Sequence, residues 1–121
     1  MWYPFLLVFV GGGLGSICRF GISLLLTPFA MRFPWATLLS NAIACLVLGI
    51  LLGLQMHQAA PDARRLFLAT GFCGGFSTFS TFSAETIQLY QSGQPLLAAA
   101  NLVGSLTVCI LCLLLGVRIV S

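Results

Sequence analysis

Four long apolar stretches restrict most strongly what this chain can fold into. They span residues 4–26, 35–54, 64–89 and 95–117, and the connections between them are short. A helix needs about 20 apolar residues to cross a hydrocarbon core about 30 Å thick. The apolar runs are continuous and do not alternate with polar residues, which argues against the strands of a membrane barrel. We therefore predict an all-α integral membrane protein of four helices that form one transmembrane domain.

Charged residues are too scarce for a soluble domain of this size. Of the 121 residues, 60% are hydrophobic and only 6% are charged, whereas soluble domains carry about a quarter charged residues. The short connections show no nucleophile–base pair and no cluster of metal ligands, so we expect neither an enzyme nor a nucleic-acid partner. No lysine or arginine precedes Arg19, and the first stretch is long for a signal peptide, so we predict a retained helix.

The basic residues give little information about orientation. The formal net charge of +3 comes from five arginines, and the chain has no lysine. An even number of spans would place both chain ends on one side, together with Arg64, Arg65 and Arg118, while Arg32 and Arg19 would lie toward the other. Such a small imbalance specifies orientation weakly and is compatible with copies that insert in both directions.

Turn-forming residues mark the connections. Thr27-Pro28 and Phe33-Pro34 predict the first connection, residues 55–62 with His57 predict the second, and residues 91–95 predict a turn before the last helix. We interpret His57 as an interfacial residue and not as a ligand.

Glycines recur at the spacing of close helix packing. GxxxG pairs occur at residues 11/15, 49/53 and 71/75. In lipid, helices associate through close van der Waals contact, which small residues allow. Four helices alone could hardly enclose a polar path away from lipid, and this favours an oligomer, whereas GxxxG alone is a common and weak signal.

Five cysteines lie in the apolar stretches: Cys18, Cys45, Cys73, Cys109 and Cys112. Cys109 and Cys112 have the CxxC spacing of some redox and zinc sites, but no second ligand pair is near them in the sequence. We interpret these thiols as packing residues.

The third stretch carries the most informative motif, GFCGGFSTFSTFSAET at residues 71–86. Paired glycines weaken a helix, and serine and threonine hydroxyls compete for its backbone groups. We therefore predict a broken third helix, whose freed carbonyls, such as those of Gly74 and Ser77, could hold a cation. The alternative is a kinked packing helix with hydroxyls bonded back to its own backbone.

Phenylalanines recur at every third position of this stretch, at Phe76, Phe79 and Phe82. Such a stripe usually serves packing, but here hydroxyl residues flank it. An aromatic ring has a positive edge, so ring edges together with hydroxyl and amide donors could line a narrow path for a small anion. A cation path would instead call for acidic rings or inward-pointing carbonyls.

A few polar residues interrupt the other apolar stretches, where they are costly and suggest function. Asn41 follows Thr37 by one turn, Asn101 precedes Ser105 by one turn, and Arg19 and Glu85 lie near the ends of their stretches. An asparagine amide offers two donors to an anion. The alternative for each is an interhelical hydrogen bond, or, for the Arg19 side chain, a head group that reaches the membrane interface.

These motifs resemble the Fluc fluoride channels, also called CrcB proteins, along essentially the full length of the chain. The most specific match is GFCGGFSTFSTF at residues 71–82. GGGLGSICRF at residues 11–20 and the Thr37/Asn41 pair support it. Ser16, Phe20, Ala36, Ser77 and Asn101 depart from the usual pattern of that family, and Asn101 stands where a tyrosine is frequent.

The resemblance implies an antiparallel, dual-topology homodimer with two fluoride pathways along its interface. Phe79 and Phe82 would line the pore, Ser80 and Thr81 would supply hydroxyls, and Asn41 would donate its amide to the ion. Ser105 would belong to the polar track of the fourth helix. Carbonyls at Gly74 and Ser77 of both subunits would bind one structural Na⁺. Glu85 would lie near the mouth of the pore, and Arg19 would match the arginine of the first helix.

The favoured function is passive, electrogenic export of fluoride across the inner membrane of a bacterial cell. A neutral weak acid can enter a cell and release its anion there, and an anion channel suffices to let the ion leave when the cell is negative inside. The alternative is a small proton-coupled exporter of the multidrug type, with Glu85 as the proton carrier. A non-conducting assembly subunit and a dimer with a homologous chain are further possibilities.

Overall fold

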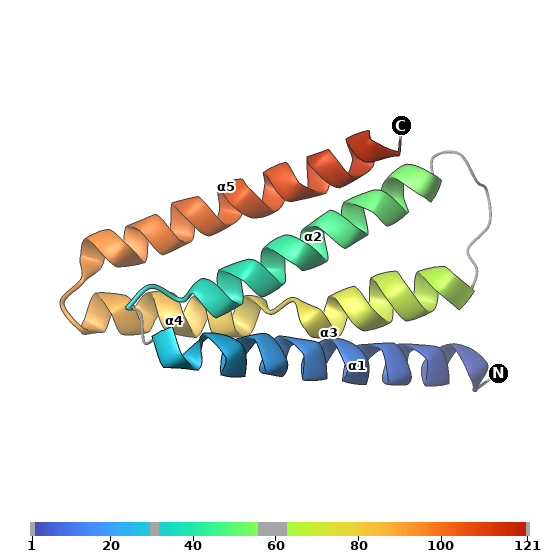
Figure 1. Cartoon of the computed structure of the whole chain (residues 1–121), viewed down its shortest axis with the longest axis horizontal. Coiled ribbons are helices and arrows are strands. Elements are labelled where there is room, and N and C mark those ends of the chain that lie inside the picture. Colours follow the sequence, from blue (N-terminus) through green and yellow to red (C-terminus); the bar gives the residue numbers. More distant parts are fainter. Residues whose placement is uncertain (1, 30–31, 56–62, 121) are drawn as a thin grey trace.

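The computed structural model describes residues 2–29, 32–55 and 63–120, and all regular structure in these ranges is helical (Figure 1). The elements are α1 (Tyr3–Leu26), the 3₁₀ turn η1 (Thr27–Phe29), α2 (Trp35–Gln55), the π-helical segment η2 (Arg65–Cys73), α3 (Gly74–Phe76), α4 (Phe79–Gln91) and α5 (Pro95–Ile119). The predicted all-α architecture is therefore confirmed. The second predicted connection with His57 lies almost entirely outside the described residues.

Three of the helices are long and apolar enough to cross a membrane: α1, α2 and α5. They nearly coincide with the first, second and fourth apolar stretches of the sequence. The third stretch does not form one long helix, because it is divided into η2, α3 and α4. Its first part is wound as a π-helix, which was not expected from the sequence, since π-helical turns are usually single and short.

Local sequence signals explain where the helices begin and end. Proline stands in the first turn of α1 and of α5, where its missing N–H costs no hydrogen bond. Between α4 and α5, Gly93 adopts a φ of +79°, which favours glycine. The backbone N–H of Gln94 donates to the Leu89 carbonyl at 3.0 Å and closes this turn. The turn predicted at residues 91–95 is confirmed.

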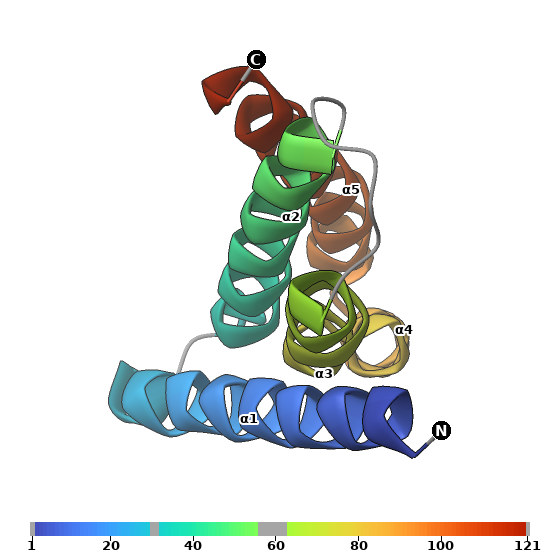
Figure 2. The ribbon, with the colours of Figure 1, turned by 90° about the vertical axis from the view of Figure 1, so that its right-hand side faces the viewer.

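The helices pack as two groups that meet along α2. Helices α2 and α5 lie side by side, and α1 packs against η2 and α3 (Figures 1 and 2). Viewed along the bundle in Figure 2, α1 crosses beneath the other helices. Both chain ends lie at the same end of the bundle in Figure 1.

The three GxxxG pairs mediate these contacts within one chain. A Cβ at Gly49 would collide with the Leu113 carbonyl, and one at Gly53 would collide with the side chain of Val120. In the other group, a Cβ at Gly15 would meet the Phe72 carbonyl, and one at Gly75 would meet the Gly12 carbonyl. The glycines therefore allow backbone contact between α2 and α5 and between α1 and the third stretch. These contacts are intramolecular, so the GxxxG pairs are not evidence for an oligomer.

Candidate functional site

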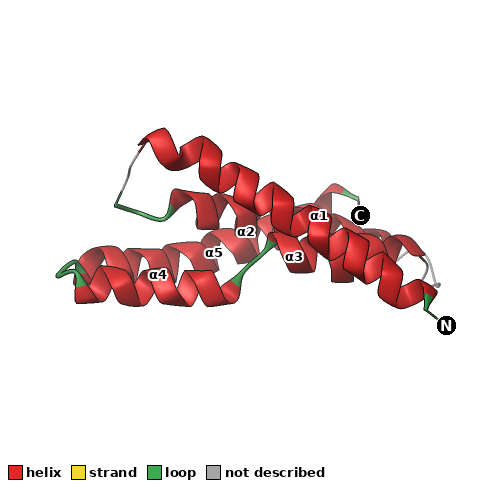
Figure 3. Cartoon of the chain, turned by 90° about the horizontal axis from the view of Figure 1, so that it is seen from below, coloured by secondary structure: helices red, strands yellow, loops and turns green. Residues whose placement is uncertain are grey.

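The site begins at an interruption between α3 and α4, seen as a short linker in Figure 3. Ser77 and Thr78 have extended backbones, with ψ angles of 158° and 115°. The Ser77 hydroxyl donates to the Cys73 carbonyl at 2.7 Å. The Thr78 hydroxyl accepts a hydrogen bond from the Thr81 amide at 3.2 Å and so caps the start of α4.

Asn41 of α2 binds the backbone of the interruption from the side. Its Oδ1 accepts from the Thr78 amide at 2.7 Å, and its Nδ2 donates to the Thr78 carbonyl at 3.2 Å. A buried backbone group without a partner is costly, and this side chain satisfies two of them. The sequence suggested Asn41 as a donor to an anion. One of its two N–H donors binds Thr78, and the second has no partner within residues 2–29, 32–55 and 63–120.

Two backbone carbonyls lose their usual helical partners at the interruption. In an α-helix, the Thr78 amide would donate to the Gly74 carbonyl and the Thr81 amide to the Ser77 carbonyl. Here the Thr78 amide donates to Asn41 and the Thr81 amide donates to the Thr78 hydroxyl. The carbonyls of Gly74 and Ser77, selected from the sequence as cation ligands, are thus released from the regular helical pattern. Oxygen ligands of this kind suit a hard cation.

Arg19 of α1 binds a third carbonyl of this region. Its Nε donates to the Gly75 carbonyl at 3.1 Å, and the Ser16 hydroxyl approaches the same oxygen at 3.4 Å. The arginine therefore ties α1 to the end of α3. The sequence left open whether Arg19 reaches the membrane interface or binds an acceptor inside the protein. The structure shows the internal contact.

A cavity of about 220 Å³ opens beside the interruption. Its lining residues come from α2, the linker, α4 and α5: Asn41, Cys45, Ser77, Thr78, Phe79, Phe82, Ser105, Leu106 and Cys109. The structure thus brings together four residues that were proposed for an ion pathway, namely Asn41, Phe79, Phe82 and Ser105. Ser80 and Thr81, proposed with them, do not line this cavity. The hydroxyl of Ser80 instead lies 3.4 Å from that of Thr78.

The two phenylalanines of the cavity differ in burial. Their ring centroids are 5.6 Å apart and the rings are tilted by 44°. Phe82 is 5% exposed and belongs to the core of the chain, whereas Phe79 is 74% exposed. One wall of the cavity is therefore an aromatic side chain at the surface of the single chain.

The sequence pointed less clearly to Cys45 and Cys109 as lining residues. Each follows a predicted polar residue by one helical turn, since Cys45 comes four residues after Asn41 and Cys109 four after Ser105. That spacing is the signal by which they could have been included.

A chain of hydrogen bonds leads from this cavity between α4 and α5. The Ser105 hydroxyl donates to Asn101 Oδ1 at 3.0 Å, and Asn101 Nδ2 donates to the Thr86 hydroxyl at 2.8 Å. The Thr86 hydroxyl donates in turn to the Phe82 carbonyl at 2.8 Å. Asn101 is only 1% exposed, so its amide is satisfied by these partners within the chain.

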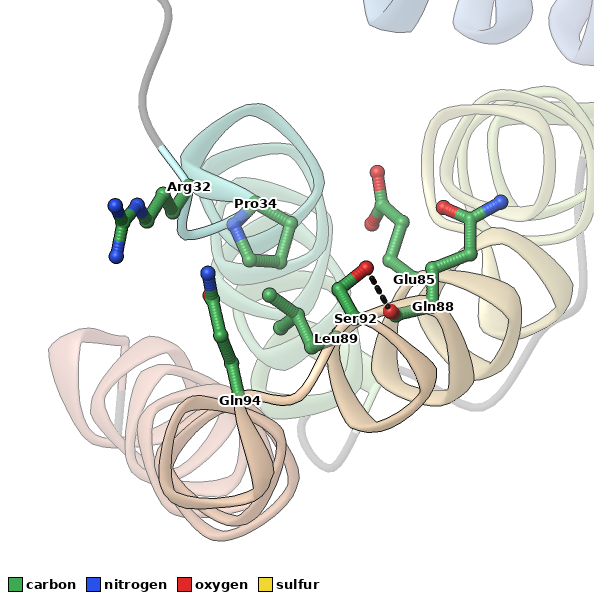
Figure 4. A pocket seen from close by; sticks show the side chains of 7 residues that line it. All are labelled: Arg32, Pro34, Glu85, Gln88, Leu89, Ser92 and Gln94. Carbon is green, nitrogen blue, oxygen red and sulfur yellow. Dashed lines mark hydrogen bonds between the residues drawn. The ribbon is translucent and has the colours of Figure 1, made fainter.

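A second cavity, of about 360 Å³, lies where α4 meets the turn before α5 (Figure 4). Its lining residues are Arg32, Pro34, Glu85, Gln88, Leu89, Ser92 and Gln94. Glu85 Oε1 is buried and has no hydrogen-bond partner among the described residues, while the Thr37 side chain interacts with the same carboxyl group. In Figure 4, Arg32 lies on the other side of Pro34 from Glu85. Thr37 and Glu85, both singled out from the sequence, are therefore neighbours, and Glu85 lines the second cavity.

Apolar helices around an interrupted, hydroxyl-rich segment define a multi-pass membrane protein, with a mostly apolar cavity beside the interruption. Residues 6–117 match the family described as CrcB-like protein, Camphor Resistance (CrcB), and the chain belongs to this family. It is 48% identical over 112 residues to a protein of Pyrococcus abyssi (strain GE5 / Orsay), covering 92% of this chain and 90% of the relative. It is 40% identical over 124 residues to a protein of Nitrobacter winogradskyi, covering 98% and 96%. Both relatives are named fluoride-specific ion channel FluC.

Proposed function

We propose that this chain forms a fluoride-specific ion channel. The observation that carries the proposal is the convergence of an amide, a hydroxyl and two phenylalanines on one cavity beside the helix interruption. Relatives in the same family, with sequences that align over most of this chain, are named as fluoride-specific channels. An ion channel is not a class of enzyme, in line with the expectation from the short connections.

The lining of the 220 Å³ cavity suits a small anion that must bind and leave again. The remaining N–H of Asn41 and the ring edges of Phe79 and Phe82 present partial positive charge. The Ser105 hydroxyl, whose proton is donated to Asn101 Oδ1, would have to turn away from that partner to donate to an anion. None of the described lining residues carries a formal charge. Conduction requires binding sites that are favourable enough to enter and weak enough to leave, and such donors meet this requirement better than a lysine or arginine.

The direction of transport follows from the membrane potential. One elementary charge gains about 2.3 kcal/mol for each 100 mV it crosses, so a cell that is negative inside expels an anion through a passive pore. We place the protein in the inner membrane of a bacterial cell, where this potential exists. The channel then lowers cytoplasmic fluoride without a chemical energy source.

A second copy of the chain completes the pathway in this proposal. Phe79 is largely exposed on the single chain, so one side of the cavity needs another wall. An antiparallel homodimer supplies that wall and fits the weak orientation signal of the five arginines. A homologous chain in place of the second copy would be detected as a failure of the purified single protein to conduct.

The interruption also supports a structural Na⁺ at the centre of such a dimer. The released carbonyls of Gly74 and Ser77 have the chemistry of a hard-cation site, and two copies would double the number of ligands. The ion would supply positive charge that holds the two interruptions together. Exchange of Na⁺ for a large organic cation should then lower the melting temperature of the purified protein.

The deciding experiment is fluoride efflux from liposomes that contain the purified protein, followed with a fluoride electrode. Rapid efflux that requires a potassium ionophore, with chloride retained, supports electrogenic and selective conduction. Efflux that does not depend on the ionophore would point to coupled, electroneutral transport, and the passive-channel proposal would be wrong. Absence of efflux from folded dimers would equally overturn it.

A further inference from the structure

Two thiols lie on neighbouring helices at the wall of the candidate ion pathway. In the contact between α2 and α5, Gly49 packs against Leu113 and Gly53 against Val117, and this register places Cys45 one turn earlier opposite Cys109. Both thiols line the 220 Å³ cavity with Asn41 and Phe82. Both are free thiols, and fluoride conduction as proposed above uses neither. Cys45 also lines an adjoining cavity of about 150 Å³, together with Cys73 and the backbone region of Gly74.

The composition of this pair selects a particular class of metal ion. Thiolates are soft ligands that prefer Cu(I) and related thiophilic cations over Mg²⁺, Ca²⁺ or Na⁺. Structural zinc calls for four ligands, and within residues 2–29, 32–55 and 63–120 no three His, Cys, Asp or Glu side chains are grouped to hold a metal. A monovalent d¹⁰ ion, by contrast, is satisfied by two sulfurs in a nearly linear arrangement.

We propose that Cys45 and Cys109 form a two-coordinate site for a monovalent thiophilic cation, Cu(I) or Ag(I), and that occupancy of this site blocks the ion pathway. The site itself depends only on the thiol pair, whereas the block rests on the proposed function. On binding, both thiols release their protons to water and one cation enters. The pair changes from neutral to a net charge of −1.

This new charge acts directly on a permeating anion. It lies in the wall of the same cavity as Asn41 and Phe82, where the surroundings are apolar and charges interact more strongly than in water. A bound metal also occupies space beside the Ser105 hydroxyl. Both effects oppose the passage of fluoride, so micromolar thiophilic cation should act as an inhibitor.

The test uses Ag⁺ as the probe, in chloride-free nitrate buffer, on the Cys18→Ser/Cys112→Ser background. This background removes the exposed thiol of α1 and the thiol one turn from Cys109. Silver retained after desalting is measured by elemental analysis, and fluoride efflux is measured on the same preparation. We expect one Ag⁺ per chain and loss of efflux. Addition of Cys45→Ser or Cys109→Ser should raise the half-inhibitory Ag⁺ concentration at least about tenfold, since one of two ligands is lost.

The amount of bound silver tests the metal site, and fluoride efflux tests the proposed channel function, so the two can fail independently. If silver binds one per chain and Cys109→Ser abolishes binding, the site stands even where no fluoride flux is seen. Unchanged binding and block in a Cys45→Ser/Cys109→Ser variant would overturn the proposal, as would wild-type protein that retains no silver. Because serine is nearly isosteric with cysteine, each variant should keep the elution volume of the parent. If one does not, Cys45→Ala and Cys109→Ala replace it in the same two measurements.

Discussion

The side-chain amide of Asn41 forms two hydrogen bonds with one residue, accepting from the Thr78 amide at 2.7 Å and donating to the Thr78 carbonyl at 3.2 Å. A residue of α2 thus takes over hydrogen bonds that a continuous helix would make for itself. The pairing stabilises an extended backbone between two helical segments and places the candidate ion pathway beside it.

Asn41→Ala should destabilise the protein and abolish fluoride efflux. The substitution leaves two part-buried backbone groups of Thr78 without partners, and an unpaired group costs about 1–3 kcal/mol when it is fully buried. Because these groups are only partly buried, we expect the free energy of unfolding in detergent to fall by about 1–3 kcal/mol. Ser40→Ala is the matched control: Ser40 is fully buried, and its hydroxyl has no partner in the described part of the chain. This control should be neutral or slightly stabilising, and equal losses in both variants would refute the role given to Asn41.

Arg19→Met should weaken the attachment of α1 to α3. The variant loses the bond from Arg19 Nε to the Gly75 carbonyl, and a hydrogen bond to a charged group contributes about 1.5–3 kcal/mol. Thermal unfolding in detergent measures the effect. Ser16→Ala affects the same carbonyl at 3.4 Å, near the limit of a hydrogen bond, and should cost less than about 0.5 kcal/mol. A larger effect from Ser16 than from Arg19 would contradict this assignment.

Gly116→Ala should separate α2 from α5. A Cβ there would collide with the Leu46 carbonyl and lie 2.8 Å from the Ile50 amide. Overpacking of this kind costs about 1–3 kcal/mol, measured as the change in unfolding free energy. Gly104→Ala in the same helix meets no atom within 4 Å and should instead stabilise the chain by about 0.5–1 kcal/mol, because alanine favours a helix over glycine. The prediction fails if the two variants shift stability in the same direction.

Thr86 and Asn101 should be energetically coupled. Their side chains form a 2.8 Å hydrogen bond between α4 and α5. A double-mutant cycle with Thr86→Val and Asn101→Leu should give a coupling energy of about 0.6–1.7 kcal/mol, the range for hydrogen bonds between membrane helices. Additive effects of the two substitutions would mean that this bond contributes nothing to stability.

Alanine substitutions at the two phenylalanines of the cavity should affect different quantities: Phe82→Ala the stability of the protein, and Phe79→Ala the rate of fluoride efflux. Phe82→Ala removes a core ring and should cost about 3–5 kcal/mol of unfolding free energy. Phe79→Ala removes an exposed ring and should change the stability of the single chain by less than about 0.5 kcal/mol. We nevertheless expect it to slow fluoride efflux at least about tenfold, since a ring edge is lost from the pathway. Normal efflux through Phe79→Ala would remove this residue from the proposed path.

Local features of the sequence were sufficient to predict α1, α2, α5 and the turn before α5, but not the π-helical winding of η2. The lengths of the apolar runs set the bounds of α1, α2 and α5, because each run must match the thickness of a hydrocarbon core. The turn with Gly93 followed from residue types that favour turns. In the third stretch, paired glycines and hydroxyl residues marked the region in which α3 ends and α4 begins. These properties depend on residues that are close together in the chain, so they can be recognised from the sequence without knowing the tertiary structure.

Only the tertiary structure decided which polar groups meet. The partner of Asn41 is 37 residues away, and that of Arg19 is 56 residues away. Such pairs depend on how each helix is rotated and where it crosses its neighbours, which spacing along one helix does not determine. The same geometry excluded Ser80 and Thr81 from the cavity, brought Cys45 to Cys109, and directed the glycine pairs to contacts within one chain. The sequence determined which residues were candidates for an ion pathway, and helix packing decided which of them line the cavity beside the interruption.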